Sequence, residues 1–249
     1  MTLIHKRTFL TVVMSLLVYG VTLAQQYPVF TQYYYNELVI NPAYAGAHVQ
    51  FSATAMYRNQ WVNFPGAPKT LDFSTHSSFL KNKIGLGLMV NHDEIGSYKN
   101  QHVYFSYAYK LHFGKATLAL GLQAGVNILG VDFSDLDLQD ETDELLTSAF
   151  NKLKPNFGTG IYFSKKNYFI GLSVPFIINN KLATTSVEDF VSEIREARYY
   201  FLRGGAVFPI DRFEKVKFNP SFLMRTQEGM ALSFDANIAF IFYDAFALG

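Results

Sequence analysis

The sequence contains no cysteine among its 249 residues, and only 16% of them are charged. Without cysteine the chain has no disulfide framework, no thiolate metal site and no cysteine nucleophile. The 21 basic and 20 acidic residues nearly cancel, so the chain lacks the basic surface of a nucleic-acid-binding protein, and we expect no nucleic acid partner. The apolar fraction of 49% excludes a disordered chain.

Aromatic residues are abundant instead, with 24 Phe and 16 Tyr. Phe and Tyr favour strands. Combined with low charge, they indicate strands that carry a wide apolar surface, which faces either a protein core or lipid.

Residues 1–24 have the pattern of a secretory signal peptide. Lys6 and Arg7 precede an apolar run from Phe9 to Ala24, and the small Ala24 precedes a plausible cleavage site. The run is shorter than the about 20 residues that a spanning helix needs, so an uncleaved anchor is the weaker interpretation. No comparable run follows it, so any membrane-spanning part of residues 25–249 consists of strands.

The rest of the chain alternates between apolar and small or polar residues with a period of two. Residues 118–128 show it most clearly, with Leu120 and Leu122 on one face and Gly121 and Gln123 on the other. We count about ten such strands, at residues 49–57, 71–77, 84–90, 103–111, 118–128, 157–163, 168–174, 199–208, 216–224 and 232–242. The faces of the strand at 199–208 cannot be assigned, because both are apolar or small.

The polar faces favour a membrane barrel over a soluble sandwich. They carry mostly Gly, Ala, Ser, Asn and Gln, whereas the wet face of a soluble sandwich usually carries Lys and Glu. Aromatic residues gather near strand ends, as in the interfacial girdles of outer-membrane proteins: Tyr57, Trp61, Phe64, Tyr109, Phe113, Phe163, Tyr168, Phe242 and Tyr243. The predicted fold is all-β, a transmembrane antiparallel β-barrel of about ten or more strands.

The connections differ in length, as in outer-membrane barrels, where short turns lie at one rim and long loops at the other. We expect tight turns at 165–167 and 91–97. Long connections are expected at 132–154, which is acidic, and at 179–197, which is polar and could hold a short helix beginning near Ser186 and Glu188.

The segment 25–48 is aromatic, does not alternate, and ends in an Asn-Pro turn followed by glycine. We expect it to plug the lumen or to lie across the periplasmic mouth of the barrel. A second motif ends the first strand. The two motifs supply the candidate structural or partner-binding residues, Asn41, Pro42, Ala43, Tyr44, Ala45 and Gly46, then Arg58, Asn59, Gln60 and Trp61.

These motifs, with residues 66–70 (Gly-Ala-Pro-Lys-Thr), 219–222 and 235–237, resemble the PorP/SprF family. Its members are outer-membrane proteins of the type IX secretion and gliding machinery of Bacteroidetes. The resemblance covers the chain after the signal peptide. It implies a barrel that anchors or helps export secreted cargo such as adhesins, and implies no catalytic residues. Its implied partners are cargo proteins, periplasmic or lipoprotein secretion components, and outer-membrane lipid.

Family members run some tens of residues further than Gly249, where another strand is starting. Since single-chain bacterial barrels have an even number of strands, we expect a chain truncated at its C-terminus. The alternative is a short family member that closes at ten strands.

Other chemistry is weakly supported. Asp72, Ser74 and His76 have the residue types of a hydrolase triad, but neighbours on one strand face are about 7 Å apart, too far for nucleophile and base. The acids from Asp135 to Glu144 lack the spacing of a calcium loop. Lys110, Lys217 and Arg225 lie on presumed lumen faces, where we expect them to pair with Asp72 and Asp235. We expect no enzyme, cofactor or metal.

Two functions remain open on these observations. The first is an outer-membrane component of the type IX secretion machinery that holds secreted cargo through protein–protein contacts. The second is a small diffusion channel, since small lumen-facing residues would leave room for water. They differ in whether the lumen is open.

Overall fold

The computed structural model describes residues 33, 36–48, 50–131, 150–187, 190–195, 197–213, 215–243 and 245–249. The predicted signal peptide and the acids of the predicted acidic loop lie outside the described residues. Two 3-10 helices, η1 (Glu37–Val39) and η2 (Pro42–Tyr44), precede the strands. Among the described residues, no helix is long and apolar enough to cross a membrane.

The strands are β1 (Ser52–Asn59), β2 (Lys69–Phe79), β3 (Ile84–Ile95), β4 (Tyr98–Phe113), β5 (Ala116–Val131), β6 (Phe150–Lys165), β7 (Tyr168–Val174), β8 (Lys181–Val187), β9 (Phe190–Arg195), β10 (Tyr199–Ala206), β11 (Phe208–Pro209), β12 (Val216–Gln227), β13 (Ser233–Phe242) and β14 (Phe246–Leu248). All ten predicted strands are confirmed, as β1 to β7, β10, β12 and β13.

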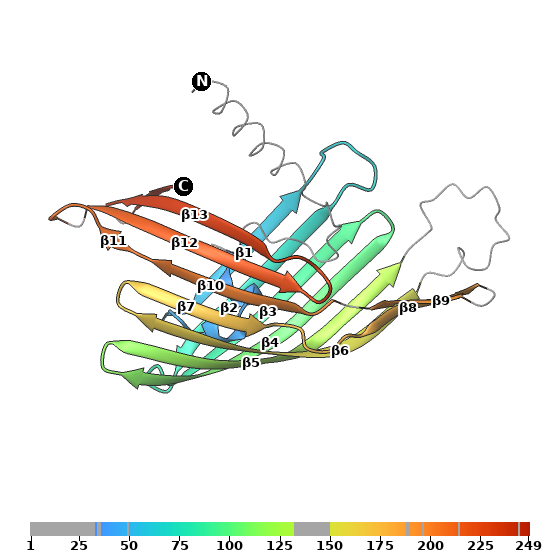
Figure 1. Ribbon diagram of the computed structural model, residues 1–249, viewed down its shortest axis with the longest axis horizontal. Coiled ribbons are helices and arrows are strands. Elements are labelled where there is room, and N and C mark those ends of the chain that lie inside the picture. The colour runs from blue at the N-terminus through green and yellow to red at the C-terminus, as the bar shows by residue number, and fades with distance from the viewer. Residues whose placement is uncertain are drawn as a thin grey trace, which may run out of the picture.

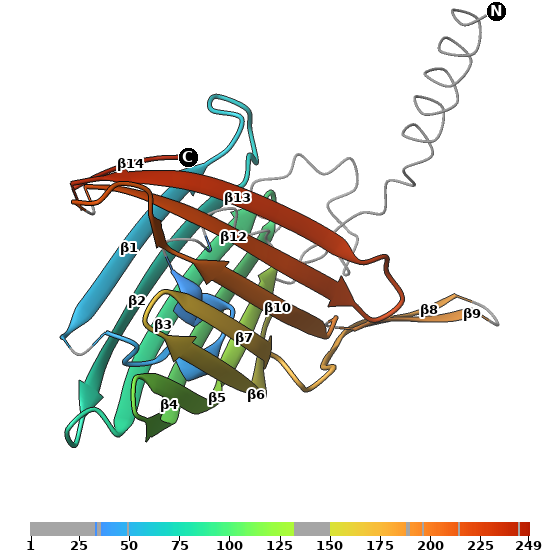
Figure 2. The same cartoon turned by 60° about the vertical axis from the view of Figure 1, so that its left-hand side comes forward.

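Twelve of these strands form one antiparallel sheet in which nearly every strand pairs with its neighbours along the chain. The order runs from β1 to β7 and then through β10, β12, β13 and β14, so β1 and β14 are its two edges. The sheet is strongly curved, and the blue turns η1 and η2 lie inside the curve (Figures 1 and 2).

Side chains alternate between the two faces of the sheet, as predicted. In β4 the inner residues Tyr104 and Ala108 are fully buried, while the outer Phe105 and Tyr109 are 51% and 44% exposed. The same alternation continues in β5 and β7. The outer surface is therefore apolar and uncovered, the condition of a barrel wall that faces lipid.

The connections form two rims of different character. The short-turn rim comprises residues 80–83, 114–115, 165–167, 210–215 and 243–245. The long-loop rim comprises residues 60–68, 96–97 and 228–232, with the connections from β5 to β6 and from β7 to β10. The two connections predicted to be long, from β5 to β6 and from β7 to β10, leave the same rim, although that rim also holds the two-residue turn at 96–97.

Three local predictions are wrong. The helix expected within 179–197 is absent from the described residues of that range. They form the hairpin of β8 and β9, which projects from the main sheet (Figures 1 and 2). Residues 150–154 belong to β6 rather than to a loop, because they pair with the last residues of β5. Residues 91–94 likewise belong to β3, and the turn itself is only Gly96 and Ser97.

Candidate functional site

The interior of the curved sheet is occupied by the chain itself. We use the name lumen segment for Tyr33 and residues 36–48, the described residues just before β1. Residues 36–43 of this segment are all buried, and Ala45 has no exposed surface. The helix η1 contacts β3, and η2 contacts β4, β5 and β6.

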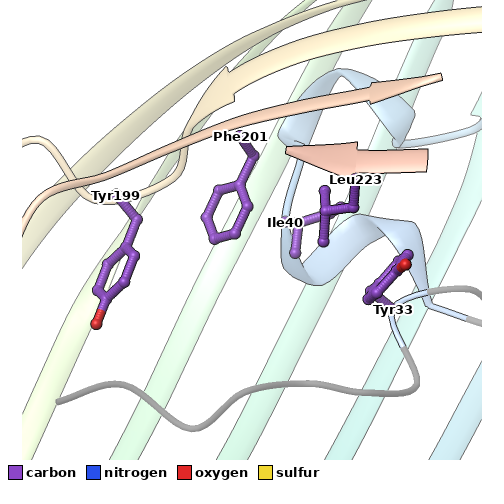
Figure 3. Packing of buried hydrophobic residues seen from close by; sticks show 5 residues of the cluster. All are labelled: Tyr33, Ile40, Tyr199, Phe201 and Leu223. Atoms are coloured by element: carbon purple, nitrogen blue, oxygen red, sulfur yellow. The ribbon is translucent and has the colours of Figure 1, made fainter. Parts of the chain in front are cut away.

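The apolar packing of the described residues is organised around this segment. Each of the three clusters of buried apolar side chains contains at least one of its residues. In the first, Tyr33 and Ile40 meet Phe201 and Leu223 from the far wall (Figure 3). Val39 packs against Met89, Tyr104 and Phe176 in the second cluster. The wall and the lumen segment therefore share one core.

A buried ion pair fastens η1 to β10. Arg203 Nη2 lies 2.9 Å from Glu37 Oε1, with side-chain exposures of only 6% and 9%. The same guanidinium donates through Nη1 to the carbonyl oxygen of Tyr33 at 2.8 Å and lies over the Tyr33 ring at 5.1 Å. Burial raises the pKa of the Glu37 carboxyl, although Arg203 and a hydrogen bond with Tyr162 act in the opposite direction.

The Asn-Pro motif forms the capped start of η2. Asn41 Oδ1 accepts a hydrogen bond from the backbone N–H of Ala43 at 2.9 Å, with Pro42 at the first helical position. Its Nδ2 donates to the carbonyl oxygen of Ile161 in β6 at 3.1 Å. One side chain thus caps the turn and attaches it to the wall.

Glycines of the inner wall let the turn approach closely. A Cβ at Gly121 would lie 2.1 Å from the nitrogen of Ala43, and one at Gly85 would lie 1.9 Å from the carbonyl oxygen of Ala45. Both distances are shorter than any non-bonded contact that a Cβ atom makes with a nitrogen or oxygen atom. Backbone therefore rests directly on backbone, which only glycine permits.

The end of the motif is attached to β2 and β4. Gly46 has φ of +65°, and its N–H donates to His76 Nδ1 at 3.2 Å. Its carbonyl oxygen accepts a hydrogen bond from Lys110 Nζ, which also donates to Asn82 Oδ1 at 2.7 Å. The expected pairing of Lys110 with Asp72 is wrong, because the lysine donates its hydrogen bond to the backbone of the lumen segment instead.

The residues considered as a hydrolase triad contact the lumen segment. Asn36 Nδ2 donates to Asp72 Oδ1 at 2.6 Å, and Ser74 Oγ donates to Asn36 Oδ1 at 2.9 Å. His76 accepts from Gly46, as described above. The three side chains thus hold one buried peptide segment rather than each other. In the described part of the chain, His, Asp and Glu form no group of three that could hold a metal ion.

The second motif lies at the long-loop rim, whereas the first lies inside the curved sheet. Arg58 and Asn59 end β1, opposite Thr70 and Lys69 of β2, and the N–H of Gln60 donates to the carbonyl oxygen of Pro68 at 3.0 Å. Trp61 follows in the β1–β2 loop and is 71% exposed. The structure therefore does not bring the two motifs together: β1 runs from one rim to the other between them.

Sequence reasoning missed the residues that hold the lumen segment from the far wall. Arg203 lies on the strand whose faces could not be assigned. Asn237 belongs to the motif at 235–237, but nothing in the sequence indicated that it donates to the Tyr33 hydroxyl, at 2.6 Å. Glu37 did carry a signal. It is the only Asp, Glu, Lys or Arg between residues 25 and 48, and a lone charge in an aromatic segment requires a partner when buried.

The asparagine at the start of η2 allows a direct test of this attachment. Asn41→Ala removes both hydrogen bonds and is expected to lower the free energy of unfolding by about 2 kcal/mol, about 1 from each bond. Asn41→Ser keeps a capping oxygen and loses only the donor to Ile161, so its effect should be smaller. Urea unfolding in lipid vesicles measures both. Equal effects of the two variants would contradict a capping role.

The fold and this site together define a class: a strongly curved antiparallel sheet with an apolar outer face, as in the walls of membrane β-barrels, whose interior is filled by its own N-terminal segment. Residues 22–249 match the family model of the type IX secretion system membrane protein PorP/SprF. The chain therefore belongs to the PorP/SprF family of type IX secretion system membrane proteins, as the motifs indicated. A search of curated proteins finds no match.

Proposed function

We propose that this protein is an outer-membrane anchor of the type IX secretion machinery, which holds secreted cargo such as adhesins through protein–protein contacts at its long-loop rim. The observation that carries the proposal is the filled lumen. A segment buried along residues 36–43, with an ion pair to the wall, leaves a frame suited to binding rather than to passage of solutes. The division into short turns and long loops supports an outer-membrane location.

The β1–β2 loop is the surface that we assign to cargo. It carries Trp61, Val62 and Phe64, which are 71%, 67% and 67% exposed, and the sequence from 60 to 68 has no charged residue. Exposed aromatic residues are favoured anchors in protein interfaces. Two turns shape the loop, with the N–H of Phe64 donating to Trp61 O and that of Ala67 to Phe64 O. A loop ordered before binding loses less entropy on binding.

Affinity purification of the tagged full-length protein from membranes of the source organism tests the function. We expect mass spectrometry to find a large secreted protein, a periplasmic or lipoprotein secretion component, or both. The purified barrel should conduct few ions in planar bilayers. A lone barrel with steady conductance would overturn the proposal in favour of a diffusion channel.

The loop assignment has its own test. Trp61→Ser combined with Phe64→Ser should lower the recovery of secreted cargo at least tenfold, since each large anchor contributes about 2 kcal/mol or more. Stability should change little, because both side chains are exposed. The matched control combines Phe213→Ser with Tyr243→Ser at the short-turn rim, where the side chains are 80% and 67% exposed. Equal losses in both variants would contradict the assignment.

A further inference from the structure

The two rims differ in charge. In the sequence, the short-turn rim has seven basic residues against three acidic ones, a net of four positive charges in a chain whose total is +1. All seven basic residues are exposed: Lys81, Lys83, Lys115, Lys165, Lys166, Arg212 and Lys215. The sequence between β5 and β6, at the other rim, has seven acidic and no basic residues from 132 to 149.

The basic residues follow a repeated arrangement with aromatic residues of the outer face. Phe79 and Lys81, Phe113 and Lys115, and Lys166 and Tyr168 are pairs two residues apart in three successive short turns. The three rings are 48%, 61% and 47% exposed. Each ring is the outward-facing residue where its strand ends, and the lysine stands just beyond it. Aromatic rings at that depth lie at the membrane–water interface, and lysines beyond them reach the headgroups.

The fourth basic turn, at residues 210–215, also places a lysine beside exposed aromatic rings, but in a different geometry. Lys215 Nζ lies 5.6 Å from the ring centres of both Phe213 and Tyr243, which are strongly exposed. The carboxylate of Asp211 in this turn accepts a hydrogen bond from the N–H of Val216 at 2.8 Å. This carboxylate is therefore engaged by the turn's own backbone.

We propose that the short-turn rim binds the phosphate headgroups of anionic phospholipids in the leaflet around it. The distribution of charge favours lipid over an acidic protein. The lysines belong to four separate turns rather than to one patch. These turns lie along one end of the curved sheet (Figure 2). Headgroups surround a barrel on every side, whereas a protein docks on one face. Each Lys or Arg near an anionic membrane surface raises the binding constant by up to about fivefold.

Spin-labelled lipids test the proposal on the full-length protein in phosphatidylcholine vesicles. Electron paramagnetic resonance gives the fraction of labelled lipid that the protein immobilises. We expect phosphatidylglycerol to associate up to about fivefold more strongly than phosphatidylcholine. The preference should fall toward one in about 1 M salt, where charges more than about 3 Å apart are screened.

The discriminating variants change three exposed lysines at a time. The triple variant Lys81→Gln, Lys115→Gln and Lys166→Gln should lose at least half of the preference for phosphatidylglycerol. The matching arginine triple should retain it. The control triple changes Lys69, Lys152 and Lys181, which are also exposed and lie toward the long-loop rim, to Gln and should retain it as well.

Equal selectivity of the rim and control triples would overturn the proposal, as would the absence of any preference for phosphatidylglycerol in the wild type. If the rim triple keeps its lipid selectivity but no longer recovers a periplasmic secretion component, the rim binds an acidic protein instead. The lipid measurement uses no cargo, so it is independent of whether the anchoring function is correct.

Discussion

Replacing Arg203 with methionine is expected to lower the free energy of unfolding by about 3 kcal/mol or more. The substitution leaves Glu37 buried without its ion-pair partner and removes the donor to Tyr33 O, and breaking a buried pair costs more than the pair itself contributes. Because burial raises the pKa of Glu37, its carboxyl takes up a proton more readily once Arg203 is removed, and this limits the loss of unfolding free energy. Urea unfolding in lipid vesicles and single-barrel conductance in planar bilayers would measure the effect, the second by reporting release of the lumen segment.

The chain provides a matched control in Arg198. Its Nη1 lies 2.8 Å from Glu228 Oε1, but the side chains are 29% and 47% exposed, so Arg198→Met should cost no more than about 1 kcal/mol. The double variant Glu37→Gln with Arg203→Met should recover part of the lost stability, because no charge is then left buried. Similar small losses at Arg203 and Arg198 would show that the buried pair does not hold the lumen segment.

Valine at Gly121 or Gly85 should displace the Asn41–Gly46 turn from the wall. The new Cβ would lie about 2 Å from backbone atoms of Ala43 or Ala45, so the backbone rather than a side chain must move. We expect each substitution to lower the free energy of unfolding by about 3 kcal/mol, at the upper end of overpacking effects. Protease susceptibility of the N-terminal segment in folded vesicle-bound protein gives an independent measurement.

Ala124→Val is the control for this experiment. Ala124 lies on β5 as Gly121 does, but on the exposed outer face, so added methyl groups meet lipid rather than the lumen segment. Its stability and protease resistance should be those of the wild type. If Gly121→Val behaves in the same way, the close approach of backbone to backbone does not matter for the fold.

These two experiments also bear on function, because both target the filling of the lumen. An anchoring barrel needs a rigid frame and no passage, so loss of the segment should weaken cargo capture without adding a useful activity. A diffusion channel should instead conduct as the wild type, and its variants should show no change in cargo recovery. Cargo recovery from the variants and conductance of the wild type therefore separate the two functions.

Much of the sheet was predictable from local pattern. The ten strands, the inner and outer faces of β4, β5 and β13, and the unequal rims all followed from period-two alternation and turn residues. The failures were also local in origin. The sequence of the hairpin of β8 and β9 lacks a clear alternation. The start of β6 contains Lys152, Lys154 and Pro155, which are typical of a loop, and it is a strand only because it pairs with β5.

The site was only half predictable. The Asn-Pro-Ala-Tyr-Ala-Gly motif indicated a capped turn, and an aromatic segment before the first strand indicated a lumen plug as one of two positions. The wall residues that contact the lumen segment were not predictable from the sequence. Ile161, which binds Asn41, and Arg203, which binds Glu37, come from strands far along the chain, and no short-range pattern connects them with residues 36–46.

The chain's alternation decides that it forms strands and which face of each strand is apolar, because a period of two is a property of near neighbours. Only the folded structure decides what occupies the interior. The ion pair of Glu37 with Arg203 and the fit of Ala43 and Ala45 onto Gly121 and Gly85 depend on the register of many strands at once. Register is the sum of all pairings across the sheet, so no single segment contains it.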